Sequence, residues 1–107
     1  RTAGVMTMFL HITDARPLHD YVVAVRFDNG ESGQADLLPA LQGPMFAPLL
    51  DQALFKALCV DPELKTIVWP NGADLAPEYV YFLAFRDRPE LQRTFANWGY
   101  LAESVSH

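Results

Sequence analysis

The sequence contains few side chains that could perform catalysis or hold a metal. His19 and Asp20 are adjacent, and His11 could approach them if the first two extended segments pair. Imidazole and carboxylate groups can serve acid–base chemistry or bind zinc. However, neighbours in an extended chain point to opposite faces, and the histidines lack the spacing of a helical zinc motif. The third histidine, His107, is the last residue of the sequence and has no such spacing to another histidine. We therefore predict no metal site.

Cys59 is the only cysteine, so an internal disulfide cannot form. A thiolate beside a histidine could act as a nucleophile. Its neighbours Leu58 and Val60 are apolar, and a lone cysteine between them is typical of a small core residue. The sequence shows neither a nucleophile elbow nor a phosphate-cradling glycine loop. We therefore expect no catalytic residues, no enzyme activity and no cofactor, and a single cysteine fits a reducing cytosol.

The best candidate for a ligand site consists of Trp69, Asn71 and Asp74. They combine a tryptophan at a strand end, an Asn-Gly turn and the start of a helix, whose unpaired N–H groups could receive a small polar or anionic ligand. In the alternative interpretation, Asn71 forms the turn, Asp74 caps the helix and Trp69 fills the core. This structural interpretation accounts for every one of these residues.

A candidate interface lies near the end of the chain. Leu91, Phe95 and Trp98 fall on one face of an amphipathic helix, and Tyr100 follows them. The face could pack on the protein's own sheet. Otherwise it is an exposed apolar surface of the kind that binds a protein partner or a second copy, since Trp and Tyr often dominate interface energies.

Size and charge limit the classes of function. The chain has 107 residues, half of them apolar, and a formal charge of −5. We expect one domain over 1–107, with a core at about 9–85 and a helical extension over 86–107. The acidic balance argues against direct binding to nucleic acid, which needs clustered cations. The apolar run at 79–85 is far too short to span a membrane.

A β-hairpin over 21–37 is the central element of the predicted fold, and the other elements must pack around it. Apolar residues alternate along 21–27, and Asn29-Gly30 is a strong hairpin signal. A two-residue loop would place polar residues beside the apolar face. A three-residue loop with Gly30 in the left-handed region instead joins Ala35 and Leu37 to that face, so we favour the bulged turn.

Shorter elements flank this hairpin. The run 9–13 predicts a first strand that ends before Pro17, which lacks a backbone donor. A tight helical turn is expected at 38–44, and a separate short turn begins at Asp51. The segments 58–60 and 66–69 predict two antiparallel strands joined by a turn around Pro62.

Two helices are expected after the strands. Asp74 to Glu78 is typical of a helix start, and the apolar run 79–85 is interpreted as a largely covered helix, with a strand as the alternative. Asp87 to Glu90 has the spacing of a capping box, and Gly99 predicts the end of the last helix. The fold class is therefore α+β: a small meandering antiparallel sheet with a short helix packed on it and a C-terminal amphipathic helix.

Three runs carry a resemblance to a known family: 27–31 (Phe-Asp-Asn-Gly-Glu), 36–39 (Asp-Leu-Leu-Pro) and 68–78, which contains Trp-Pro-Asn-Gly-Ala-Asp. Over roughly His11 to Tyr81, the chain resembles the uncharacterised bacterial family called domain of unknown function 2442. The resemblance implies a small α+β domain and no activity. Family members occur alone, beside other small proteins, or ahead of a helix-turn-helix domain, for which the segment after Phe82 is short.

Together these features favour a non-enzymatic, cytosolic protein-interaction or regulatory module that docks a protein partner or forms a homodimer. The resemblance adds that the chain could be one half of a two-gene pair. A small-ligand-binding domain that uses Trp69, Asn71 and Asp74 is the first alternative, and a DNA-associated regulator is the second.

Overall fold

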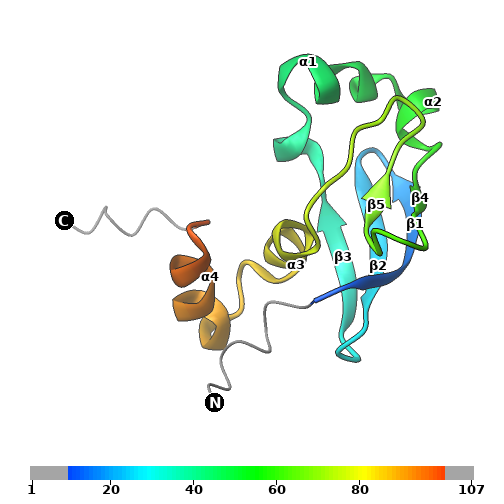
Figure 1. The fold of residues 1–107 in the computed structure, drawn as a ribbon. Helices are drawn as coiled ribbons and strands as arrows, with labels where there is room; N and C mark the ends of the chain where they lie inside the picture. Colours follow the sequence, from blue (N-terminus) through cyan, green and yellow to red (C-terminus); the bar gives the residue numbers. More distant parts are fainter. Residues whose placement is uncertain (1–9, 101–107) are drawn as a thin grey trace.

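The computed structural model describes residues 10–100, which form the predicted α+β fold (Figure 1). A three-stranded antiparallel sheet contains β1 (Ile12–His19), β2 (Val22–Phe27) and β3 (Ser32–Asp36), in the order β1-β2-β3. Short helical segments lie beyond one end of the sheet, and of the two longer helices that follow, the first lies beside β3 and the second lies beyond the first. The meandering sheet is therefore confirmed.

The β2–β3 hairpin has the predicted bulged turn. Val23 pairs with Ala35, and the Phe27 N–H donates to the Glu31 carbonyl at 2.9 Å. Gly30 adopts a φ of 91°, a conformation that glycine reaches without a steric cost. The three-residue loop thus brings the alternating apolar side chains of both strands onto one buried face.

The predicted end of the first strand before Pro17 is wrong, because β1 continues to His19. Pro17 stands opposite Val23. In β2, Val23 directs its backbone hydrogen bonds toward β3, so the Pro17–Val23 pair is one without ladder hydrogen bonds. The missing N–H of Pro17 therefore removes no bond from the sheet. The chain turns later, at Asp20, which has a φ of 47°.

Four short helical segments follow β3 and cover the upper end of the sheet in Figure 1. They are the 3-10 helices η2 (Leu38–Ala40) and η3 (Ala47–Leu50) and the helices α1 (Gly43–Phe46) and α2 (Gln52–Phe55). Prolines occupy the first turns of η2, α1 and η3, where no donor is lost. The Asp51 carboxylate accepts the Ala53 N–H at 2.9 Å, so the separate turn predicted at Asp51 is confirmed.

The predicted second strand pair is also present. Strands β4 (Cys59–Val60) and β5 (Ile67–Val68) are antiparallel and form their own two-stranded sheet. The Asp61 carboxylate holds the connecting turn by accepting the N–H groups of the two residues that follow Pro62. The Ile12 N–H donates to the Lys65 carbonyl at 2.9 Å and so joins this turn to the start of β1.

Helix α3 (Pro77–Phe85) confirms the prediction of a covered helix at 79–85. It packs on β3, and its apolar residues are buried around almost the whole circumference. The fully or nearly buried ones are Val80, Tyr81, Phe82, Leu83 and Phe85.

A last helical unit consists of η4 (Pro89–Leu91) and α4 (Gln92–Trp98). It ends at Gly99, which has a φ of 89°, as predicted. The predicted capping box is wrong, because no side chain caps either helix start. Instead, the Gln92 amide donates to the carbonyls of Arg86 and Arg88 at 2.8 and 2.7 Å. Figure 1 shows α4 beside α3, on the side away from the sheet.

Candidate functional site

The described histidines do not gather into one site. His11 Nδ1 lies 2.9 Å from an Asp28 oxygen, whereas His19 Nδ1 lies 3.3 Å from Asp20 at the other end of β1. Strand β1 therefore separates His11 from His19 and Asp20, so the grouping of the three that the sequence left open is not present. Among residues 10–100, no three His, Cys, Asp or Glu side chains are arranged to hold a metal ion. His107 lies outside the described residues.

Cys59 is exposed, so its predicted place in the core is wrong. Successive side chains of a strand point to opposite faces, and here Leu58 is the buried neighbour. Strand β4 has only two residues, so the apolar neighbours of Cys59 in the sequence do not reveal which face of the strand is buried.

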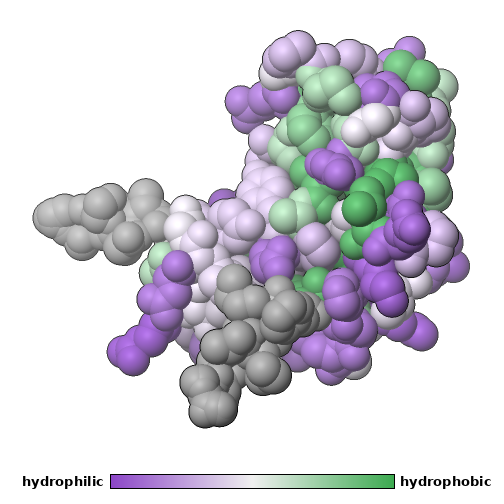
Figure 2. Space-filling model, in the orientation of Figure 1, coloured by the Kyte–Doolittle hydropathy of each residue, from purple (hydrophilic) through white to green (hydrophobic). Residues whose placement is uncertain are grey.

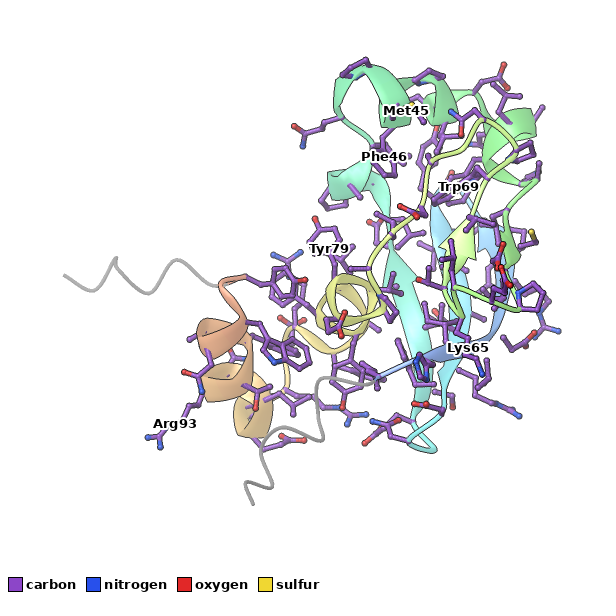
Figure 3. The ribbon with its side chains drawn as sticks, viewed as in Figure 1. Met45, Phe46, Lys65, Trp69, Tyr79 and Arg93 are labelled. Atoms are coloured by element: carbon purple, nitrogen blue, oxygen red, sulfur yellow. The ribbon has the colours of Figure 1, made fainter. Side chains whose placement is uncertain are left out.

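The turn after β5 uses its polar groups internally. Trp69 is only 3% exposed, and its indole N–H donates to the Phe55 carbonyl at 2.9 Å. The rings of Phe46 and Phe55 lie beside it, with centroids 6.2 and 5.9 Å away. Figure 3 shows Trp69 beneath the short helices, between them and the sheet. The tryptophan therefore fills the core at this end of the molecule.

Asn71 and Asp74 have separate roles. The Asn71 side chain accepts the Ala73 N–H at 3.1 Å and donates to the Met45 carbonyl at 3.0 Å, which ties the turn to α1. Asp74 forms a β-bridge with Val68, and Ala76 occupies the N-cap position of α3. The prediction that Asp74 caps the helix is wrong. The structure brings the three ligand candidates into one turn, with the indole buried and the Asn71 amide already bonded.

The predicted C-terminal interface is partly used inside the molecule. Phe95 is fully buried, and Leu91, Trp98 and Tyr100 are half-buried against the core. The face packs on α3 rather than on the sheet: the Phe95 ring meets Phe82 edge-on at 5.1 Å. Burial raises the pKa of the Tyr100 hydroxyl, and burial followed by the charge of Glu31 raises the pKa of Tyr81.

The structure also exposes a second group of large apolar side chains, which no sequence pattern marks. Four large side chains of the short helices are 44–49% exposed. We call this set the apolar cap, and it consists of Leu38, Met45, Leu50 and Leu54. Figure 2 shows hydrophobic residues in green among hydrophilic ones at the end that carries α2, and Figure 3 shows Met45 there. The segments are too short for helical periodicity to separate inward from outward residues.

The structure also contains an open groove of about 420 Å³ beside β3. One wall consists of Gln34 and Asp36, and the other consists of residues 83–89, from the end of α3 to the start of η4. No sequence motif marks this groove, because it arises only where β3 and the end of α3 meet.

None of the helices in the part of the chain from 10 to 100 has the length and apolarity that crossing a membrane requires. Helix α3, the longest, spans Pro77–Phe85, far short of the ~20 residues of a bilayer-spanning helix.

Comparison of the fold finds a solved structure of similar architecture. The crystal structure of Putative DNA Binding Protein NE0471 from Nitrosomonas europaea ATCC 19718 matches with a TM-score of 0.68 and 19% sequence identity. The match covers 92% of this chain and 66% of that protein, so this chain spans less than two thirds of its length. At this identity the likeness concerns the fold alone. No curated protein matches the sequence.

The family match extends over most of the fold. The family described as protein of unknown function DUF2442 matches residues 12–86, from the start of β1 to the residue after α3. This range contains both sheets, the short helices and the turn around Trp69, as the resemblance of the hairpin and of the Trp-Pro-Asn-Gly run implied. The chain therefore belongs to the DUF2442 family of proteins of unknown function.

Proposed function

We propose that this chain is a non-enzymatic protein-interaction module of the cytosol, and that it docks a protein partner through the apolar cap. The observation that carries the proposal is the concentration of exposed apolar side chains in the short helical segments after β3. Within residues 10–100, six large apolar side chains are exposed, and four of them belong to the cap. Exposed apolar groups that gather on a small domain are typical of interaction sites.

The cap is held in place by contacts with the rest of the fold. The Tyr21 hydroxyl donates to the Leu50 carbonyl, and the Asn71 amide donates to the Met45 carbonyl. The Phe46 ring packs edge-on against Trp69 below. The apolar side chains therefore project from a surface fixed before binding, which lowers the entropic cost of docking.

The test compares tagged wild-type protein with the double variant Leu50→Lys/Leu54→Lys. The control is Leu64→Lys, since Leu64 is 54% exposed and lies in the β4–β5 turn, outside the cap. We expect a partner captured from the host lysate to be lost with the double variant and kept with the control. Light scattering after gel filtration measures the molar mass, and so shows whether the apolar cap binds a second copy of the chain instead of another protein. A monomer that captures nothing, or a partner kept by the double variant, would contradict the proposal.

A DNA-associated regulator is the second candidate, supported by the fold shared with the Nitrosomonas europaea protein and by that protein's name. The formal charge of −5 opposes it, because binding to the phosphate backbone depends on cations. A gel-shift assay with duplex DNA at low and high salt tests this candidate. The absence of a salt-sensitive shift would eliminate it.

A further inference from the structure

The outer edge of β3 carries backbone groups that point away from the sheet. The Phe27 N–H donates to Glu31, and the Leu37 N–H donates to Tyr21, both at 2.9 Å. These bonds close the two ends of the β2–β3 ladder, and hydrogen-bonded pairs alternate with non-bonded pairs between them. The non-bonded positions of β3 are Ser32, Gln34 and Asp36.

The N–H and C=O groups of these three residues therefore face outward. Strand β3 is the outer member of its sheet, and within residues 10–100 no backbone hydrogen bond to another segment involves Ser32, Gln34 or Asp36. An open row of donors and acceptors of this kind is a template for pairing with another strand.

The groove described above reaches this open edge at Gln34 and Asp36. Gly33 and Ala35 belong to the face that α3 covers, so the side chains of Gln34 and Asp36 lie on the opposite face. A groove lined both by Gln34 and Asp36 and by residues 83–89 must pass the edge between the two faces. Figure 1 shows β3 as the outer strand with α3 beside it. Its volume of about 420 Å³ falls within the usual range of binding sites.

The groove is lined by two arginines and two aspartates, and the arginines are already engaged by other groups of the protein. The Arg86 guanidinium lies over the Phe82 ring at 5.1 Å, and the Arg88 guanidinium lies over Phe85 at 4.2 Å and pairs with Glu31 at 3.1 Å. The aspartates have no cationic partner: among the described residues, no cation forms an ion pair with Asp36 or Asp87, and the Asp36 carboxylate accepts the Leu38 N–H at 3.1 Å.

We propose that this groove binds an extended basic peptide segment of a partner protein, which adds to β3 as a further strand. Its backbone pairs with the outward groups of Ser32, Gln34 and Asp36. Alternate side chains face the end of α3, and lysine or arginine side chains approach Asp36 and Asp87. A second copy of the chain would be a poor occupant. If its β3 paired with this β3, it would bring another Asp36 instead of a cation, and residues 28–55 contain no lysine or arginine.

The experiment uses a fluorescein-labelled peptide of alternating lysine and valine, followed by fluorescence anisotropy. Two matched peptides serve as controls: one replaces lysine by glutamate, and one is N-methylated at alternate amides so that it cannot pair as a strand. We expect binding of the first peptide alone. In an NMR spectrum, it should also slow hydrogen exchange of the Ser32, Gln34 and Asp36 amides.

The test variant is Gln34→Pro, which removes one outward N–H. Proline is tolerated at such an edge position, as Pro17 is in β1. We expect affinity to fall about tenfold, which corresponds to one lost hydrogen bond. Asp87→Asn should weaken binding and reduce its salt dependence while leaving the strand intact.

The surface variants separate this proposal from that of the apolar cap. Leu50→Lys/Leu54→Lys should leave the affinity for the lysine–valine peptide unchanged, because these residues do not line the groove. No binding by the lysine–valine peptide, equal binding by the N-methylated peptide, or unchanged affinity in both the folded Gln34→Pro protein and Asp87→Asn would overturn the proposal.

Discussion

The Cε1 atom of Phe85 lies 2.8 Å from the position that a Cβ atom on Gly33 would occupy. Helix α3 therefore approaches β3 as closely as it does because residue 33 has no side chain. The Phe85 ring cannot easily retreat, since it is 5% exposed and packs against Tyr81 at 4.8 Å and under the Arg88 guanidinium.

This contact predicts that Gly33→Ala destabilises the fold by about 1–3 kcal/mol, the usual cost of overpacking. Alanine elsewhere in a strand is normally favoured over glycine. The free energy of unfolding in urea measures the effect, and Phe85→Leu in the same chain should recover part of it through a double-mutant cycle. Unchanged or increased stability of Gly33→Ala would disprove the steric account.

Trp69→Phe should destabilise the protein by at least about 1–3 kcal/mol. The substitution removes the indole donor to the Phe55 carbonyl, which then keeps only the Leu58 N–H at 3.2 Å, and it replaces a buried indole with a smaller ring. Trp98→Phe is the matched control, because Trp98 is half-buried and no hydrogen bond of its indole is present among the described residues. Thermal unfolding by circular dichroism compares the two, and equal losses would count against the role of this hydrogen bond.

Phe95→Ala should cost about 3–5 kcal/mol, the range for deleting a buried aromatic ring. The residue is fully buried between the rings of Phe82 and Trp98. Arg93→Ala, on the exposed side of the same helix, should change the stability by no more than about 0.5 kcal/mol. A much smaller loss of stability in Phe95→Ala would indicate that the C-terminal face is not packed on α3 and is free to act as an interface.

Asp61 predicts a specific dependence of stability on pH. Its pKa is lowered by the backbone N–H of Leu64 and then by that of Glu63, which hydrogen-bond to the carboxylate. The stabilisation is fully present above the ordinary aspartate pKa of about 3.9 and is lost as the pH falls through the lower, folded value. The stability difference between wild type and Asp61→Asn should therefore shrink below about pH 4. A constant difference between pH 7 and pH 2 would contradict this assignment.

The sequence predicted the elements whose determinants are local. In the β2–β3 hairpin, strand alternation and a glycine at position 30 select one register, and the structure has that register. The β4–β5 pair and the end of α4 at Gly99 follow from similarly short signals.

The features that depend on which backbone groups pair, and on which faces are covered, could not be predicted. Pro17 lies inside β1 because it forms a pair without ladder hydrogen bonds with Val23, and residue types alone do not reveal which kind of pair a position forms. Asp74 forms a bridge with Val68 instead of capping α3 for the same reason. The apolar cap and the β3 groove depend on which faces remain uncovered after the helices pack, so they emerge only from the assembled structure.

The hydrogen bond from Ile12 to Lys65 also has a consequence for the order of folding. It joins residues about 50 positions apart, whereas the β2–β3 hairpin closes over a few residues. Closing the longer loop costs more chain entropy, by about (3/2)RT times the logarithm of the length ratio. We therefore expect the hairpin to be formed in the folding transition state and the β4–β5 turn to attach to β1 afterwards. Folding and unfolding rates of Val25→Ala and Ile67→Ala would give a high φ-value for the first and a low one for the second.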